Sequence, residues 1–148
     1  MPSATKCLLF LRHVPLFQGM AWTQLRQLTA YLELARFRAG EVIFAEGERG
    51  QQIYIIMSGR VRIMKAYGKP GEQILATLAE TDFFGDMGIL EGEPHGATAV
   101  ADGATEVLCL GAETFQHLLR HHPSMVFALG RELSARVRHT TRTRFRDA

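Results

Sequence analysis

Cysteine is scarce in this sequence. The 148 residues include two cysteines, Cys7 and Cys109, which lie far apart and are each set among apolar residues. Two such cysteines form no disulfide framework, and neither has a second cysteine at metal-ligand spacing. We therefore expect buried free thiols in a reducing cytoplasm, with no metal site and no cofactor.

Long apolar runs and an excess of one charge are also missing. The longest early apolar run, Cys7 to Leu11, is too short to span a membrane and too short for a signal-peptide core. The formal net charge of +2 gives no reason to expect nucleic-acid binding by the chain as a whole. We expect a cytoplasmic protein with no membrane partner.

The sequence lacks the motifs of common catalytic centres. It has no Gly-x-Ser-x-Gly elbow, no P-loop and no His-Glu-x-x-His pair. Asp82 and Asp86 have the spacing of a carboxylate pair, but no nucleophile motif accompanies them. His117 and His121 stand four residues apart, yet no carboxylate lies at a useful spacing, so we interpret them as surface histidines. We expect no enzyme activity.

The composition, 47% hydrophobic and 22% charged, is that of an ordinary soluble globular protein. The length is enough for one domain with a real hydrophobic core. We predict a single α+β domain over residues 1–148. Its parts are N-terminal helices (1–34), an antiparallel β-roll of jelly-roll type (36–110) and C-terminal helices (113–146).

The first part has a helical period. Leu25, Leu28 and Leu32 recur at helical spacing, and Thr23 is a plausible N-cap. Pro15 and Gly19 interrupt the segment. We therefore predict two short helices rather than one long helix.

The second part changes to a period of two. Ile53, Ile55 and Met57 alternate with Tyr54 and Ile56, and turn-forming residues recur about every ten residues. Short strands at this spacing are typical of an antiparallel roll or barrel. The stretch from Ala97 to Leu110 predicts a final hairpin around Asp102-Gly103.

The third part is predicted to be helical again, with Pro123 in the first turn of a long helix. Apolar residues form one narrow seam on it: Val126, Leu129, Leu133, Val137 and Thr140. The seam can pack on the roll or against its twin in a second subunit, and its narrowness and length favour a homodimer. The arginines between Arg131 and Arg146 form either a solvated face or a partner contact.

The stretch from Phe84 to Ala99 carries the chemistry. Gly85 and Gly88 flank Asp86 and Met87 at the start of a predicted helical turn, where backbone can approach a ligand and amides can attract an anion. A carboxylate beside that anion can accept hydrogen bonds from sugar hydroxyls. His95 supplies positive charge when protonated. Taken alone, the pattern also fits a glycine-rich connection.

The order of these residues resembles the phosphate-binding cassette of the cyclic-nucleotide-binding domain family, in which Phe-Gly-Glu leads through apolar residues to Pro-Arg-Ser/Thr/Ala-Ala. The resemblance covers nearly the whole chain. Its further motifs are Val14-Pro15-Leu16-Phe17, Gly40 to Phe44 with Glu46-Gly47-Glu48, and a hairpin of Ile53 to Ile56 with Ser58 to Val61. It implies a regulatory sensor domain that binds cAMP or cGMP, similar to the catabolite-activator branch.

The resemblance also implies roles for individual residues. Asp86 replaces the glutamate that binds the ribose 2′-hydroxyl, and the amides of Met87 and Gly88 bind the cyclic phosphate. Thr140 and Thr141 correspond to a Thr-Ser pair that reaches the purine across a dimer interface. The implied ligand-binding residues are Gly85, Asp86, Met87, Gly88, His95, Gly96, Ala97, Thr140 and Thr141.

Two departures from the pattern concern the phosphate. His95 stands where the family has arginine, and Gly96 stands where a hydroxyl residue is frequent. Loss of the charge-assisted contact should cost roughly 1.5–3 kcal/mol, or about ten- to a hundredfold in affinity. A neighbouring phosphate would raise the pKa of His95 and recover part of that.

Three interpretations therefore stay open. The first is weakened, pH-dependent cyclic nucleotide binding. The second is a degenerate roll that serves dimerisation or protein interaction, and the third is another effector, such as haem on a histidine. No helix-turn-helix is recognised before Ala148, so we expect a stand-alone sensor or one part of a larger protein.

Overall fold

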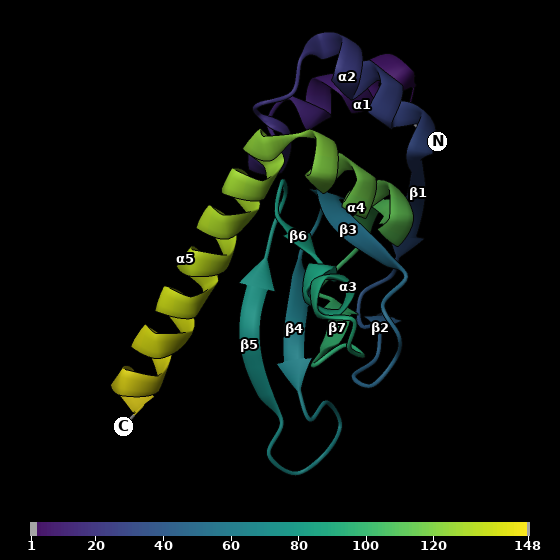
Figure 1. The fold of residues 1–148 in the computed structure, drawn as a ribbon. Coiled ribbons are helices and arrows are strands. Elements are labelled where there is room, and N and C mark those ends of the chain that lie inside the picture. The colour runs from purple at the N-terminus through teal and green to yellow at the C-terminus, as the bar shows by residue number, and fades with distance from the viewer. Residues whose placement is uncertain (1–2, 148) are drawn as a thin grey trace.

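The computed structural model describes the backbone of residues 3–147 and the side chains of residues 3–136 (Figure 1). It has the expected α+β fold, with helices that precede and follow the β-roll in the chain. The elements in chain order are α1 (Ala4–Leu11), the 3₁₀ turn η1 (Pro15–Phe17), α2 (Trp22–Leu28), the 3₁₀ turn η2 (Thr29–Tyr31), β1 (Leu32–Phe37), β2 (Val42–Phe44), β3 (Gln52–Ser58), β4 (Val61–Lys65), β5 (Gln73–Leu78), β6 (Phe83–Phe84), α3 (Asp86–Glu91), β7 (Thr98–Ala101), β8 (Thr105–Gly111), α4 (Ala112–His121) and α5 (Pro123–Asp147).

The strands form two antiparallel four-stranded sheets, ordered β1-β8-β3-β6 and β2-β7-β4-β5. The chain changes sheet at most of its connections, so that neighbours in sequence are seldom neighbours in a sheet. Both predicted hairpins are therefore wrong as pairings. β3 pairs with β8 and not with β4, and β7 pairs with β2 and β4 and not with β8.

The physical reason is that strand β3 has two apolar faces. Ile53 and Ile55 face a core formed with the N-terminal and C-terminal helices, whereas Tyr54 and Ile56 face the interior of the roll. A strand buried on both faces lies in the middle of an architecture of several layers. Sequence alternation identifies such a strand but does not say which strand lies beside it.

The N-terminal helices agree with the prediction of two short helices. The start of α2 differs from it, because the helix begins at Trp22 and its N-cap is Ala21, not Thr23. The side-chain Oε1 of Gln24 accepts a hydrogen bond from the Ala21 N–H at 2.8 Å. The helical segment also ends earlier than predicted, because Leu32 is buried and pairs with Leu110 in a sheet.

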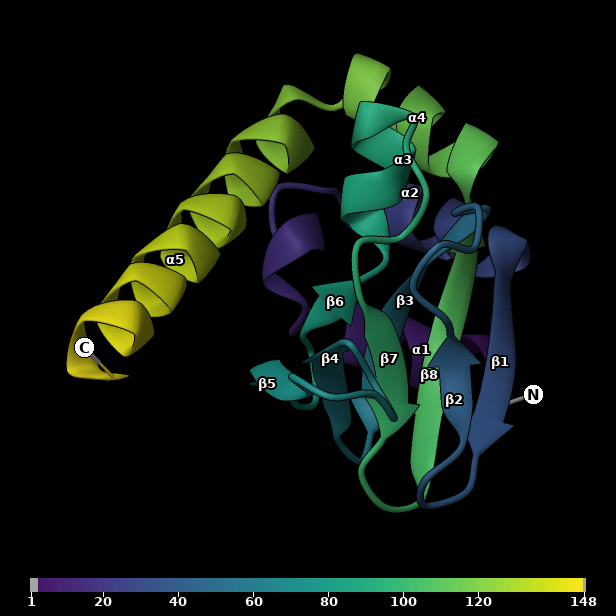
Figure 2. The ribbon, with the colours of Figure 1, turned by 90° about the horizontal axis from the view of Figure 1, so that it is seen from below.

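Helix α5 leaves the helical end of the molecule and runs down beside the roll on the side of β5 (Figures 1 and 2). Its first turns are held by Met125, Ala128 and Leu129, which are buried. No helix in the described part of the chain is long and apolar enough to cross a membrane.

Both cysteines are buried and free, as expected. Burial raises the pKa of Cys109 to about 11 and also raises the pKa of Cys7. The thiolate is the reactive form, so both side chains behave as apolar core groups.

Candidate functional site

A cleft of about 620 Å³ opens between α3, β5 and α5. The segment that resembles the phosphate-binding cassette borders it: all the predicted residues from Gly85 to Gly88 and from His95 to Ala97 line the cleft. The far wall is formed by Leu75 to Leu78 and by residues of α5. The side chains of Thr140 and Thr141 lie outside the described residues.

The entry to α3 depends on a glycine. Gly85 is the N-cap of α3 and has φ +85°. A Cβ at this position would lie 3.0 Å from Cδ2 of Tyr54 and 3.2 Å from the carbonyl oxygen of Gln52. A residue with a side chain would therefore meet both a left-handed backbone and a steric clash. Gly85 lets the chain turn sharply enough to bring Asp86 into the cleft.

Asp86 is buried and ion-paired with Arg136 of α5. The Nη1 atom of Arg136 lies 3.1 Å from Oδ1 of Asp86 and 3.4 Å from Oδ2. Its Nη2 atom donates a hydrogen bond to the carbonyl oxygen of Phe83, and the guanidinium lies 4.9 Å from the centroid of the Phe83 ring. The long helix is thus bonded directly to the start of the cassette.

The sequence prediction did not include Arg136 in the site. It was one of several arginines assigned to a solvated face or a partner contact. A signal was present, because Arg136 precedes Thr140 by four residues and therefore lies on the same face of the helix. The structure places its guanidinium in the wall of the cleft.

His95 lines the cleft and is buried. Its ring stacks on Phe44, with centroids 3.7 Å apart and an interplanar angle of 12°. A Cβ at Gly50 would lie 3.3 Å from its Cε1 atom, so the ring fills a tight slot. Burial lowers the pKa of His95 below its ordinary value, and the carboxylate of Glu48 opposes part of this effect. The surroundings therefore favour the neutral imidazole.

The lining of the cleft carries more negative than positive charge. Its carboxylates are Asp82, Asp86, Glu91 and Glu132. Among the lining residues that the structure describes, Arg136 provides the one permanent positive charge. An anionic ligand would therefore depend on Arg136, on backbone amides and on protonation of His95.

The predicted apolar seam of α5 is divided between two surroundings. Leu129 is buried in the core of its own chain and Leu133 packs against that core, so the prediction of one dimer seam is wrong for Leu129. The side chain of Val137 lies outside the described residues. Val126 and Phe127 are 51% and 70% exposed. The spacing of three and four residues predicts that α5 has an apolar face. It does not predict how much of that face is buried against the core of the same chain.

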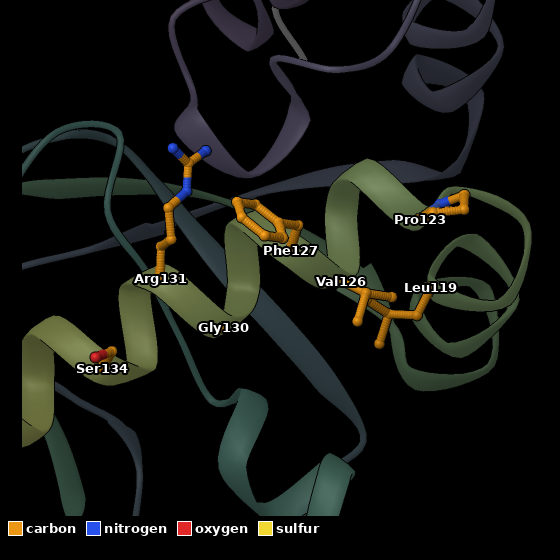
Figure 3. A pocket seen from close by; sticks show the side chains of 7 residues that line it. All are labelled: Leu119, Pro123, Val126, Phe127, Gly130, Arg131 and Ser134. Carbon is orange, nitrogen blue, oxygen red and sulfur yellow. The ribbon is translucent and has the colours of Figure 1, made fainter.

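An open groove accompanies those exposed residues (Figure 3). Its lining consists of Leu119, Pro123, Val126, Phe127, Gly130, Arg131 and Ser134. The guanidinium of Arg131 lies 5.3 Å from the centroid of the Phe127 ring. The groove is thus apolar with a cationic border.

His117 and His121 are exposed on α4, and their rings stack with centroids 4.1 Å apart. The interpretation as surface histidines is confirmed. Within the part of the chain that the structure describes, no group of three or more His, Cys, Asp or Glu residues could hold a metal ion.

Comparison with known proteins gives a consistent result. Residues 34–122 match the family model described as the cyclic nucleotide-binding domain. The chain is 33% identical, over 84% of its length, to the cyclic AMP receptor protein of Thermus thermophilus, and 32% identical, over 74%, to a cAMP-dependent protein kinase regulatory subunit of Mycosarcoma maydis. It spans 57% and 22% of those two relatives.

Solved structures show the same fold. The regulatory domain of Toxoplasma gondii PKA, crystallised with cAMP, superposes with a TM-score of 0.78 at 25% identity, covering 89% of this chain and 50% of that one. The sensor domain of the transcriptional regulator DNR from Pseudomonas aeruginosa superposes with a TM-score of 0.79 at 24% identity, covering 92% and 91%.

Proposed function

Since this chain belongs to the cyclic nucleotide-binding domain family, and is a regulatory domain of that type, we propose that it binds cAMP or cGMP in the cleft between α3, β5 and α5. The observation that carries the proposal is the position of the cassette. Asp86 and His95, nine residues apart in sequence, line one cleft together with Gly85, Gly88 and Gly96. The two relatives compared above are named for cAMP, which makes cAMP the first ligand to test.

Each cassette residue has a proposed task. The Asp86 carboxylate accepts a hydrogen bond from the ribose 2′-hydroxyl, and the amides of Met87 and Gly88 donate to the cyclic phosphate. A carboxylate has about four lone-pair sites, so Asp86 can serve the ribose and Arg136 at once. Thr140 or Thr141 contacts the base.

We propose that the His95 imidazole is neutral in the ligand-free protein and becomes protonated when the ligand binds. A phosphate beside the ring favours the imidazolium and raises its pKa against the effect of burial. Binding then takes up a proton. The affinity for an anionic nucleotide should therefore fall as the pH rises above the range in which His95 can protonate.

The signal is proposed to pass through α5. Arg136 belongs to α5 and is bonded to Asp86, the residue that receives the ribose. A ligand that binds better to one placement of α5 than to another shifts the equilibrium between the two placements. We propose that this shift is the regulatory output of the domain.

The domain is proposed to act as a homodimer through α5, without catalytic activity and in the cytoplasm. Support for the dimer comes from the exposed side chains of Val126 and Phe127 on a helix whose opposite face is buried in its own chain. Exposed apolar surface of this kind is typical of protein contacts. The proposed location in the reducing cytoplasm is supported by the two free cysteines.

Isothermal titration calorimetry tests the proposal. cAMP, and then cGMP, are titrated into the purified chain at about pH 6 and pH 8. Saturable binding that is tighter at the lower pH supports nucleotide sensing with His95 as a partial substitute for arginine. His95→Arg should then bind about tenfold more tightly. Heat no greater than dilution at either pH, with millimolar ligand, would overturn the proposal and favour an interaction domain.

A further inference from the structure

Negative charge lines the cleft on both of its walls. Asp82, Asp86 and Glu91 line it from the segment around α3, and Glu132 lines it from α5. Glu132 precedes Arg136 by one helical turn, so both lie on the face of α5 that borders the cleft. Four carboxylates against one guanidinium leave three formal negative charges among the lining residues that the structure describes, with histidine counted as neutral.

Two cations near the cleft are each paired with a carboxylate. Nη1 of Arg136 lies 3.1 Å from Oδ1 of Asp86. Lys65 bonds to the carbonyl oxygen of Gly96 without lining the cleft, and its Nζ lies 2.5 Å from Oε1 of Glu46. Each of these cations shares its charge with a carboxylate, so neither offers an anion a full positive partner.

His95 does not supply the missing charge above neutral pH. Its ring packs on Phe44 of β2 and lies beside Gly50, which precedes β3, and Gly88 of α3, none of which titrates. The charged group that acts on the ring is Glu48, and its effect is smaller than that of burial. Because burial lowers the pKa of His95, the imidazole is neutral at pH 8.

A neutral imidazole fits a hydroxyl group better than a phosphate. One ring nitrogen donates and the other accepts, whichever tautomer is present. A hydroxyl donates as well as accepts, so it can bond to the imidazole in either tautomer and also to a carboxylate. Phosphate oxygens only accept. A cyclic nucleotide has its 3′ and 5′ oxygens esterified to phosphorus, whereas the nucleoside carries both as free hydroxyls.

We infer that this cleft binds an uncharged nucleoside more tightly than the corresponding cyclic nucleotide whenever His95 is neutral. The 2′-hydroxyl donates to Asp86 in both ligands. The 3′- and 5′-hydroxyls of the nucleoside meet carboxylates and a neutral ring, and the nucleoside brings no charge that the carboxylates repel. The inference rests on the proposed function, because it concerns the ligand class of the same cleft.

Calorimetric titration of adenosine and of cAMP into the purified chain tests the inference. Both ligands are titrated at about pH 6 and pH 8, and at about 30 mM and about 300 mM salt. His95→Arg places a permanent cation in the lining, and His117→Arg makes the same change on the exposed face of α4. Glu132→Gln removes a carboxylate from the lining, and Glu113→Gln removes an exposed one from α4.

At pH 8 we expect the wild type to bind adenosine about tenfold more tightly than cAMP, and at pH 6 the difference should narrow. Added salt should strengthen cAMP binding, because it screens repulsion, and should change adenosine binding little. His95→Arg should reverse the order of the two ligands at pH 8, and His117→Arg should keep it. Glu132→Gln should bind cAMP about threefold more tightly, and Glu113→Gln should match the wild type.

Tighter binding of cAMP than of adenosine by the wild type at pH 8, or cAMP binding that weakens with added salt, would overturn the inference and leave the proposed function. Equal responses within either matched pair of variants would also overturn it, because the preference would then not depend on the charges of the cleft. Adenosine binding without cAMP binding at either pH would overturn the proposed cyclic nucleotide function and leave the nucleoside as the ligand. Binding of neither ligand would overturn both.

Discussion

Arg136 and Asp86 are fifty residues apart in sequence, and the Nη1 atom of Arg136 lies 3.1 Å from Oδ1 of Asp86. One residue belongs to the long C-terminal helix and the other opens the cassette helix. The carboxylate of Asp86 is almost fully buried, and Arg136 is its ion-pair partner. A ligand that donates a hydrogen bond to Asp86 would change the surroundings of Arg136, and this ion pair connects the cleft to α5.

Asp86→Asn tests the proposed role of the carboxylate. The side chain keeps its size but loses its charge and one acceptor. We expect the affinity for cAMP to fall about ten- to a hundredfold by calorimetry, because the ribose contact and the pair with Arg136 both weaken. Asp82→Asn is the matched control, since Asp82 lines the same cleft but accepts a hydrogen bond from the N–H of Ala79 instead. Equal losses in the two variants would contradict a specific role of Asp86.

His95 should make the stability of the ligand-free protein depend on pH. Burial lowers its folded-state pKa below the ordinary 6.5, so the unfolded chain binds more protons between these two values. The free energy of unfolding should therefore rise with pH across this window, and the stability should be lost as the pH falls through it.

Urea unfolding between pH 5 and pH 8 measures this dependence. His95→Phe keeps an aromatic ring against Phe44 and should flatten the profile. His117→Gln changes an exposed histidine and should leave the profile as it is in the wild type. A wild-type slope that persists in His95→Phe would assign the effect to another group.

Gly85→Ala tests the local geometry of the cassette. The added Cβ meets Tyr54 at 3.0 Å in a backbone with φ +85°, so conformational strain and a clash act together. We expect the free energy of unfolding to fall by about 2–4 kcal/mol. Gly40→Ala has the same φ of +85° with no atom within 4 Å, and should lose only about 1–2 kcal/mol. Urea unfolding that ranks Gly40→Ala as the more costly change would contradict the described packing.

Phe127→Glu tests the proposed dimer. The side chain is 70% exposed in the single chain, so a charge there should leave the fold intact but disrupt an apolar contact between two α5 helices. Sedimentation equilibrium should show a dimer for the wild type and a monomer for the variant. Trp22→Glu changes an exposed aromatic residue on α2 and should stay dimeric. A wild-type monomer at high micromolar concentration would exclude this interface.

The sequence indicated which cassette residues lie together better than it indicated what surrounds them. Gly85, Asp86, Gly88 and His95 were predicted together because they belong to one stretch of eleven residues, and the structure places all four in the lining of one cleft. Arg136 was missed because its partner is fifty residues away, and helical spacing alone does not identify that partner. The surroundings of His95 were also missed, since the aromatic ring that covers it, Phe44, comes from a separate strand.

The fold shows the same division between local and distant information. Periods of two and of three to four located the strands and helices, and Pro123 marked the start of α5. The pairing of β3 with β8 and of β7 with β4 depends on contacts between distant segments. The burial of Leu129 likewise depends on the core that α5 meets, and the apolar stripe of one helix does not contain that information.

The position of the ligand can be measured directly by following glycine amides in a ¹⁵N-labelled chain during a titration with cAMP. Gly85, Gly88 and Gly96 line the cleft, whereas Gly40, Gly71 and Gly103 lie outside its lining. We predict saturable shifts of the first three resonances at a common affinity, with the other three unchanged. Shifts spread over both groups, or none at millimolar cAMP, would contradict binding of the nucleotide between α3 and α5.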